Sequence, residues 1–510
     1  MISGTDGAHA ATITVAAGGD FQAALNTAQA GDTIVLEAGA SYIGPFTLPA
    51  KPASTDYITI QSSAVAQLPA GTRVSPANAA LMPKLLSPGN NQPALYTAPF
   101  SHHYKLIGIE FAPLNASVYV REIIRLGDGS LAQNTLEMVP RDLIFDRCYI
   151  HAHPTQDTIR GIALNSAETS IINSYISEFH SKGFDAQAIW GWNGPGPFKI
   201  INNYLEASGE NLGFGGAVPG VVGLIPSDIE IRRNTLSKPL SWRTEGWMIK
   251  NLFELKAAQR VVMEGNILEN CWANAQAGYA IQLTVRNEEG AASWNTIQDV
   301  TIKNNIIRRV GGGINFLGRD GNNYPSGQMS GVRIENNLFE DVSGVKWGGN
   351  GNFLQMTTVA NVTVDHNTVI HSGPNAAIIN AYAATSNAGP NAGFIFKNNI
   401  VENNAYGIFG GGIGVGNAAI AVYFPGGVFL KNVMVATPST IYPVDNFYPA
   451  LLSEVQFVNS VGGDYRLAPS SPYKRRGTDG KDPGCDFVAL YAALPDGVPN
   501  PAPSPSPSPT

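Results

Sequence analysis

The sequence predicts an all-β protein built as a parallel solenoid, and three observations predict this fold class. A short motif with an asparagine between apolar positions recurs along the second half of the chain. Apolar and polar residues alternate around the motif, which is typical of a strand with one buried face. Glycine is frequent, at 55 of 510 residues, and charged residues make up only 14%, a composition that favours short strands and turns over helices.

The repeat sets the architecture. Successive copies lie 31, 32, 39, 32, 30, 32 and 33 residues apart, centred on Asn203, Asn234, Asn266, Asn305, Asn337, Asn367, Asn399 and Asn432, and degenerate copies stand at Ser174 and Cys148. Propeller blades need four strands in ~40–45 residues and would not repeat one corner asparagine. In stacked coils each asparagine lies above its equivalent, tolerates a left-handed corner and can hydrogen-bond along the stack. We therefore predict a structural role for these asparagines, and three strands with at least one long loop per coil.

Three segments follow from this repeat. Residues 1–16 form an N-terminal extension, residues 17–495 one solenoid domain with its caps, and residues 496–510 a disordered linker rich in Pro and Ser. The stripe of Phe21, Ala24, Leu25 and Ala28 predicts a helix that caps the open end of the solenoid. Residues 33–36 read as the first buried strand. The linker is typical of secreted modular proteins, so we expect a secreted protein whose signal peptide is not in this sequence.

The bulk composition excludes several partners. No run of 18 apolar residues occurs, so no membrane span is expected. The net charge of −7 without a basic block argues against nucleic acid. Cys148, Cys271 and Cys485 have no metal-binding spacing and are expected to be buried thiols. A monomer is expected.

A polar row is predicted along the strand that precedes the asparagine corner. If Leu255, Leu283 and Phe316 point inward, the outward positions of successive coils, ~4.8 Å apart, form one row. It comprises Gln187, Glu254, Lys256, Gln282, Thr284, Arg286, Asn315, Arg319 and Gln355. In a chain with few charges, the cations Lys256, Arg286 and Arg319 on three successive coils indicate a site. We interpret Gln187, Gln282, Asn315 and Gln355 as binding residues.

Aromatic residues gather in the neighbouring loops. Trp190, Trp192, Trp242 and Trp247 are followed by Trp272, Trp294 and Trp347. Such rings could stack on sugars along a groove, or they could pack the loops on the solenoid. The cluster as a whole favours a glycan groove.

The chain resembles the right-handed parallel β-helix superfamily of the pectate-lyase type over nearly its whole length. The N-terminal GGDFQAALNTAQAGDTIVLEAGASYIGPFTL and the C-terminal GDYRLAPSSPYKRRGTDGKDPGCD look like that superfamily's first and last segments. FELKAAQRVVMEGN followed by IQLTVRN is similar to the Lys…Arg pairing of chondroitinase-B-like and alginate-lyase-like enzymes. The resemblance implies a polysaccharide lyase in which Lys256 abstracts the C5 proton of a uronic acid and Arg286 assists, with Arg319 and Glu254 in the same row. Arg286 precedes Asn-Glu-Glu-Gly, where those families have His-Gly.

Elimination requires that the carboxylate of the substrate is neutralised, either by cationic side chains or by a Ca²⁺ ion. Asp185, Glu210 and Asn211 are the candidate calcium ligands, and His180 could assist catalysis.

Two other function classes stay open. A glycoside hydrolase would use paired carboxylates, such as Glu254 with Glu210 or Asp185, or Asp320. The three-Asp and Gly-His-Gly pattern of polygalacturonases is missing. A non-catalytic adhesin or spike would use the groove for binding alone.

Overall fold

The computed structural model describes residues 10–382 and 389–498, so most of the predicted linker and the first nine residues of the predicted extension lie outside the described residues. Two compact units are present. Unit 1 comprises Met1–Ser181, Ala186–Ala207 and Pro219–Leu224, and unit 2 comprises Lys182–Asp185, Ser208–Val218 and Ile225–Thr510. The prediction of one domain over residues 17–495 stays a prediction.

Unit 1 contains three parallel sheets. Its sheet A is formed by β1 (Thr12–Val15), β2 (Thr33–Leu36), β5 (Ile58–Ser62), β8 (His102–Ile107), β11 (Arg141–Asp146), β14 (Thr169–Ile172) and β17 (Phe198–Ile201). Its sheet B is formed by β3 (Ser41–Ile43), β6 (Lys84–Ser87), β9 (Glu110–Pro113), β12 (Tyr149–His151), β15 (Tyr175–Phe179) and β18 (Tyr204–Ala207). Its sheet C is formed by β4 (Phe46–Leu48), β7 (Leu95–Thr97), β10 (Val120–Leu126), β13 (Thr158–Leu164) and β16 (Gln187–Gly191).

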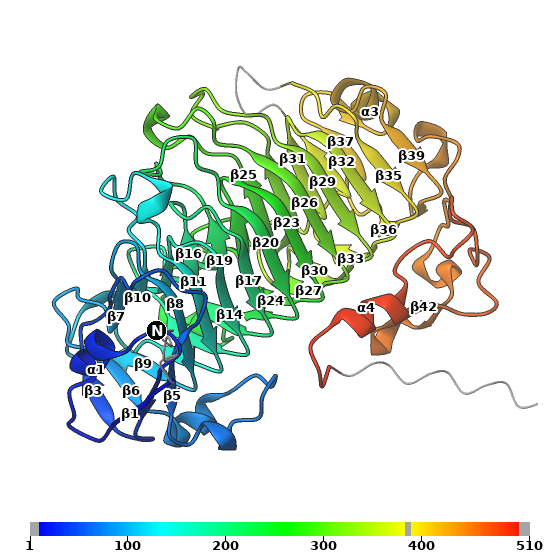
Figure 1. The fold of residues 1–510 in the computed structure, drawn as a ribbon. Helices are drawn as coiled ribbons and strands as arrows, with labels where there is room; N and C mark the ends of the chain where they lie inside the picture. Colours follow the sequence, from blue (N-terminus) through cyan, green and yellow to red (C-terminus); the bar gives the residue numbers. More distant parts are fainter. Residues whose placement is uncertain (1–9, 383–388, 499–510) are drawn as a thin grey trace, which may run out of the picture. The chain divides into compact units, whose positions relative to one another are not determined.

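Unit 2 repeats the same organisation (Figure 1). Its sheet A is formed by β20 (Ser227–Arg232), β23 (Ala258–Glu264), β26 (Ile297–Lys303), β29 (Ser330–Glu335), β32 (Ala360–Asp365), β35 (Ile395–Lys397) and β39 (Val428–Leu430). Its sheet B is formed by β21 (Thr235–Ser237), β24 (Ile267–Cys271), β27 (Ile306–Val310), β30 (Leu338–Ser343), β33 (Thr368–Ser372), β36 (Ile400–Glu402) and β40 (Val433–Val435). Its sheet C is formed by β19 (Glu210–Phe214), β22 (Phe253–Leu255), β25 (Tyr279–Thr284), β28 (Gly312–Leu317), β31 (Leu354–Thr357), β34 (Ile379–Ala381), β37 (Ile408–Gly410) and β38 (Gly414–Val415).

Within each unit, each coil contributes one strand to each sheet and pairs in parallel with the next coil along the chain. Only β38, which pairs with β37, and the hairpin of β41 (Phe457–Asn459) and β42 (Asp464–Leu467) are antiparallel among the described sheets. Inward residues such as Leu255, Leu283 and Phe316 are fully buried, so the core is a stack of aliphatic and aromatic layers. The predicted three-strand coil is confirmed, and the fold is a parallel β-helix.

The N-terminal helix forms where its apolar stripe predicts it. Helix α1 (Phe21–Thr27) begins after Asp20, whose carboxylate accepts a hydrogen bond from the Ala23 amide and caps the helix. Phe21 and Leu25 are buried, and the Phe21 ring packs edge-on against Phe46 of β4. Strand β1 pairs with β2, so the sheet already begins inside residues 1–16, the range that the sequence predicts as an extension.

The corner asparagines of unit 2 are hydrogen-bonded to one another. Each side-chain amide donates to the side-chain oxygen of the next repeat at 2.8–3.0 Å, through Asn234, Asn266, Asn305, Asn337, Asn367, Asn399, Asn432 and finally Asn446. The left-handed residue is the one before the asparagine, for example Asn336 with φ 55° or His366 with φ 54°. The expectation that the repeated asparagine itself takes this conformation is therefore wrong. Its role is to bind backbone groups that the turn would leave unpaired.

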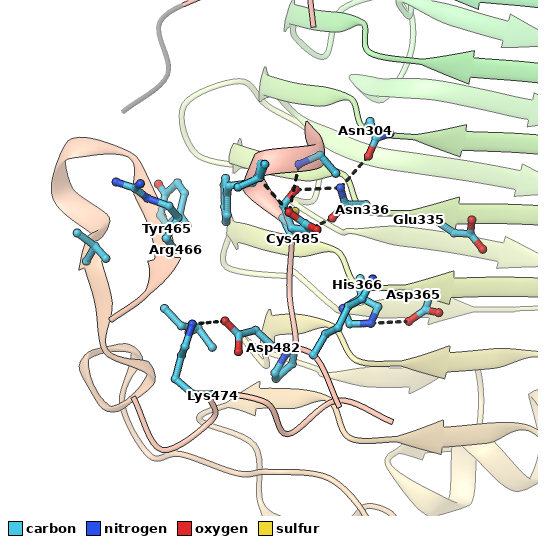
Figure 2. A pocket seen from close by; sticks show the side chains of 18 of the residues that line it. Asn304, Glu335, Asn336, Asp365, His366, Tyr465, Arg466, Lys474, Asp482 and Cys485 are labelled. Atoms are coloured by element: carbon cyan, nitrogen blue, oxygen red, sulfur yellow. Dashed lines mark hydrogen bonds and ion pairs between the residues drawn. The ribbon is translucent and has the colours of Figure 1, made fainter. Parts of the chain in front are cut away.

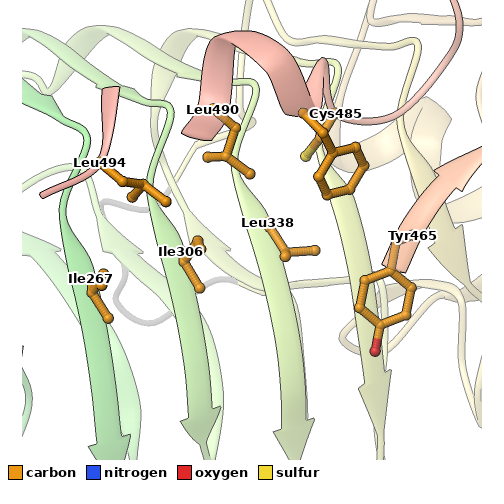
Figure 3. Packing of buried hydrophobic residues seen from close by; sticks show 8 residues of the cluster. Ile267, Ile306, Leu338, Tyr465, Cys485, Leu490 and Leu494 are labelled. Atoms are coloured by element: carbon orange, nitrogen blue, oxygen red, sulfur yellow. The ribbon is translucent and has the colours of Figure 1, made fainter. Parts of the chain in front are cut away.

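The C-terminal segment packs on the outer face of sheet B in unit 2. Helix α4 (Phe487–Ala493) buries Phe487 and Leu490 against Ile267, Ile306 and Leu338 (Figure 3). The remaining helices, α2 (Trp242–Glu245) and α3 (Asn417–Tyr423), are short. No helix within residues 10–382 and 389–498 is long and apolar enough to cross a membrane. All three cysteines are free and buried, as predicted.

Leu490→Ala should lower the free energy of unfolding by about 2–5 kcal/mol, because Leu490 is fully buried and a cavity would remain above Ile306. Val488 lies on the same helix and is 81% exposed, so Val488→Ala should change stability by less than about 0.5 kcal/mol. Urea unfolding of the two variants measures the difference. Equal stabilities would show that α4 contributes nothing to unit 2.

Candidate functional site

The outward row of sheet C in unit 2 has the register that the sequence predicts. Glu254 pairs with Gln282, Gln282 with Asn315, and Asn315 with Gln355. Parallel pairing places these side chains on one face, one coil apart. The row therefore begins with an acid and continues with three amides.

The amides are connected by hydrogen bonds. Asn315 Nδ2 donates to Gln282 Oε1 at 2.6 Å, and Gln355 Nε2 donates to Asn315 Oδ1 at 2.9 Å. Tyr279 donates its hydroxyl to Gln355 Oε1 at 3.0 Å, and Gln355 also donates to the Tyr382 hydroxyl at 3.2 Å. Both tyrosines lie outside the pattern that predicts the row, because Tyr279 precedes the row on its strand and Tyr382 follows β34. Fixed amides of this kind suit the hydroxyl groups of a sugar.

A charged cluster lies at the acidic end of the row. Lys250, in the loop before β22, places its Nζ 2.5 Å from Asp185 Oδ2 and 3.6 Å from Glu210 Oε1. Lys256 Nζ lies 4.0 Å from Glu254 Oε1. Three carboxyl groups and two ammonium groups thus meet at the ends of β19 and β22. Lys250 was missed because it stands outside every strand and no periodicity marks it.

The members of the cluster differ in exposure. The side chain of Glu210 is 1% exposed and that of Glu254 is 4% exposed, whereas that of Lys256 is 24% exposed. Burial, followed by the negative charges of Glu254 and Asp185, raises the pKa of Glu210 to about 7. Burial lowers the pKa of Lys250, but the charges of Glu210 and Asp185 outweigh it and raise this pKa above its ordinary value. Lys250 therefore stays an ammonium at neutral pH.

Arg286 lies on the coil next to Lys256, as the spacing of 30 residues predicts. Its backbone amide donates to the Lys256 carbonyl at 3.0 Å. Thr284 Oγ1 donates to Glu254 Oε1 at 3.3 Å and so helps to fix the carboxylate. Arg319, one coil further, is exposed and donates through Nε to Gln328 Oε1 at 2.8 Å. Lys256 and Arg286 are thus neighbours, and Arg319 is held by its own loop.

Gln187, Trp190 and Trp192 belong to unit 1, on β16 and the loop after it. Gln187 Oε1 accepts hydrogen bonds from Arg160, whose Nη1 also donates to Glu122 Oε1 at 2.9 Å. Trp190 is 4% exposed. Trp192 donates its indole N–H to the Gly129 carbonyl at 2.8 Å and lies under the Arg160 guanidinium. These three side chains are thus engaged within unit 1 by packing and hydrogen bonds.

The tryptophans of unit 2 form a packed cluster. Trp242, Trp247, Trp272 and Trp347 are all buried together with Ile249. Arg243 lies over the rings of Trp272 and Trp347. The proposal that Trp242 and Trp247 form an open sugar-stacking surface is corrected, because their rings instead pack the loops beside sheet C.

The candidate calcium ligands do not fit a calcium site. Asn211 Oδ1 accepts a hydrogen bond from the buried Lys238 ammonium at 2.9 Å, and its Nδ2 donates to the Ser237 carbonyl. The Lys250 ammonium occupies the space between Asp185 and Glu210. In the described parts of the chain, no three His, Cys, Asp or Glu side chains are placed to hold a metal ion.

Asp320 and His180, the other candidate acid and base, lie outside the charged cluster. Asp320 accepts hydrogen bonds from the Asn287 and Asn322 amides at 2.8 Å and so shapes the loop after β28. His180 is fully buried in unit 1, with Nε2 3.9 Å from Glu178. Neither belongs to the charged cluster.

A large cavity in unit 2 is separate from this cluster. It has a volume of about 840 Å³ and lies between the corners of sheet A and the C-terminal segment (Figure 2). Mixed ion pairs line it, including Lys474 with Asp482 and His366 with Asp365. No residue of the row or of the charged cluster contributes to its wall.

Solved structures of several polysaccharide lyases are similar in fold to this chain. No protein-family model matches the sequence, and no curated protein matches it either. A mannuronic-acid-specific polysaccharide family 6 lyase from human gut microbiota superposes with a TM-score of 0.51 at 13% identity, over 86% of this chain and 90% of that chain. The family 6 alginate lyase AlyGC gives 0.49 at 12% identity, over 92% of this chain and 58% of that chain. An alginate lyase from Paenibacillus gives 0.34 at 17% identity, over 78% and 95%. At such identities the likeness concerns the fold alone, and the chain is a parallel β-helix structurally similar to polysaccharide lyases.

Proposed function

We propose that this protein is a polysaccharide lyase that cleaves a glycan containing uronic acid by β-elimination. The observation that carries the proposal is the difference in exposure within the charged cluster. Lys256 is the more exposed of the two lysines, at 24% against 17% for Lys250, and its carboxylate neighbour Glu254 is buried. A lysine held in this way can reach a proton on a bound sugar, whereas the buried acid can only set the charge around it.

The row supplies the other parts of the reaction. Lys256 removes the C5 proton and becomes an ammonium, and this charge together with the Arg286 guanidinium opposes the negative charge that develops on the uronic carboxylate. The electrons of the broken C–H bond form the C4–C5 double bond, and the bond from C4 to the glycosidic oxygen breaks. Arg286, on the adjacent coil, stabilises the departing oxygen, which takes up a proton from water. Gln282, Asn315 and Gln355 bind neighbouring sugar units along the sheet.

A hydrolase is the second candidate, and the pKa of Glu210 favours it. A carboxyl group with a pKa of about 7 beside Glu254 resembles the acid and base pair of a glycosidase. Hydrolysis, however, requires both groups to reach the glycosidic bond, and both side chains are nearly fully buried. We therefore favour elimination.

Product analysis on a panel of uronic-acid polymers tests the proposal. Elimination creates an unsaturated sugar that absorbs in the ultraviolet together with one new reducing end per cleavage. Hydrolysis creates the reducing end without the absorbance. We expect both signals to rise in parallel. Reducing ends alone would replace the lyase by the hydrolase, and binding without either signal would favour a glycan-binding protein.

A further inference from the structure

The charged cluster contains a feature that neither elimination nor hydrolysis requires. Lys250 does not lie in the outward row, yet it contacts two carboxylates that come from separate segments of unit 2. Asp185 belongs to the segment Lys182–Asp185, and Glu210 begins β19. The side chain of Lys250 is only 17% exposed. Its ammonium is therefore enclosed by acids at the end of the row.

This position is the one that a divalent cation would need. A calcium ion binds carboxylate oxygens at about 2.3–2.6 Å. Lys250 Nζ lies 2.5 Å from Asp185 Oδ2 and 3.6 Å from Glu210 Oε1, so an ion bound to both oxygens would compete with this ammonium for the same space. The two positive charges cannot share this space, because their repulsion at such short range is large.

We propose that Lys250 is the resident cation of this site, and that its ammonium neutralises Asp185 and Glu210 in place of a divalent metal ion. A lysine and a metal ion both hold negative groups together, but the lysine is covalently part of the chain and cannot be removed by a chelator. The buried carboxyl of Glu210 gains a permanent positive neighbour, which lowers the cost of burying its charge. The site then forms without any added ion.

The part of this inference that concerns catalysis rests on the proposed lyase function, whereas the part that concerns cation binding does not. The two are separated by measuring thermal stability as well as turnover. If no polymer is cleaved, the melting experiments below still decide whether Lys250 takes the place of a metal ion.

The test compares the wild-type protein with Lys250→Met in excess EDTA and in millimolar CaCl₂. The wild type should melt at the same temperature in both buffers, and its turnover should change by less than about twofold. Methionine keeps roughly the length of the side chain but removes the charge, so Asp185 and Glu210 lose their cation. The variant should melt several degrees higher in CaCl₂ than in EDTA, because Ca²⁺ then binds the folded state.

Lys303→Met is the matched control. Lys303 also pairs with a carboxylate, since its Nζ lies 3.3 Å from Glu264 Oε1, but it lies on sheet A. This variant should show no response to calcium. A calcium-dependent shift in the wild type that disappears in Glu210→Gln would overturn the proposal, and so would a folded Lys250→Met that ignores calcium. Should Lys250→Met fail to fold, the wild-type comparison with Glu210→Gln alone decides the matter.

Discussion

Lys256→Ala should lower the turnover number for elimination by about 10²- to 10⁴-fold, the usual contribution of a general base, while the melting temperature stays close to that of the wild type. The side chain is partly exposed and its ion pair with Glu254 is long, at 4.0 Å, so its removal leaves no cavity in the core. Initial rates from ultraviolet absorbance and a thermal melt measure the two effects.

Two further variants distinguish a base from a positive charge. Arginine keeps the charge but cannot give up its proton at neutral pH, so Lys256→Arg should bind substrate and still be inactive. Lys303→Ala removes a lysine of sheet A and should leave the rate unchanged. Full activity in Lys256→Arg would show that the charge alone matters, and full activity in Lys256→Ala would remove this residue from the mechanism.

Asn337→Ala should lower the free energy of unfolding by about 3 kcal/mol or more, the sum of several buried groups left without a partner. Asn337 Nδ2 donates to the Ile302 carbonyl at 2.8 Å and to Asn367 Oδ1 at 3.0 Å, and its Oδ1 accepts from the Asn305 amide. All of these groups are buried, so water cannot replace the amide. Urea denaturation measures the loss.

The control for this variant is Asn322→Ala. Asn322 is exposed in the loop after β28, and its replacement should change stability by less than about 0.5 kcal/mol. If Asn337→Ala were equally mild, the asparagine row would be a consequence of the fold rather than a source of its stability.

The residues that sequence predicts well are those that repeat. Gln282, Asn315 and Gln355 were aligned from the alternation around each coil, and the observed register matches because a slip by one residue would expose Leu283 and Phe316. Loop residues follow no such constraint. The sequence pattern therefore does not mark Lys250, although it forms the shortest ion pair of the cluster.

The tryptophans show a second limit of the sequence. Trp242 and Trp247 have the composition of a sugar-binding surface, but composition does not say which side of a ring is covered. Loops outside the coils must bury some apolar area of their own, and the Trp cluster with Ile249 does so. The left-handed residue of each corner, such as Asn336, was also misplaced by one position, because periodicity fixes the repeat but not its dihedral angles.

The interval between Asn266 and Asn305 is 39 residues, against 30–33 between the other copies. This longer interval shows how a groove along sheet C can gain new side chains. Strands β24 and β25 are joined by residues 272–278, whereas β27 and β28 are separated by Gly311 alone. The longer connection does not disturb the asparagine row, yet it carries Gln276, whose Oε1 accepts hydrogen bonds from Asn251 and Gln282. Lengthening a loop costs little free energy, while the coils keep their register. New side chains can therefore be delivered to the groove one coil at a time, without re-forming the core.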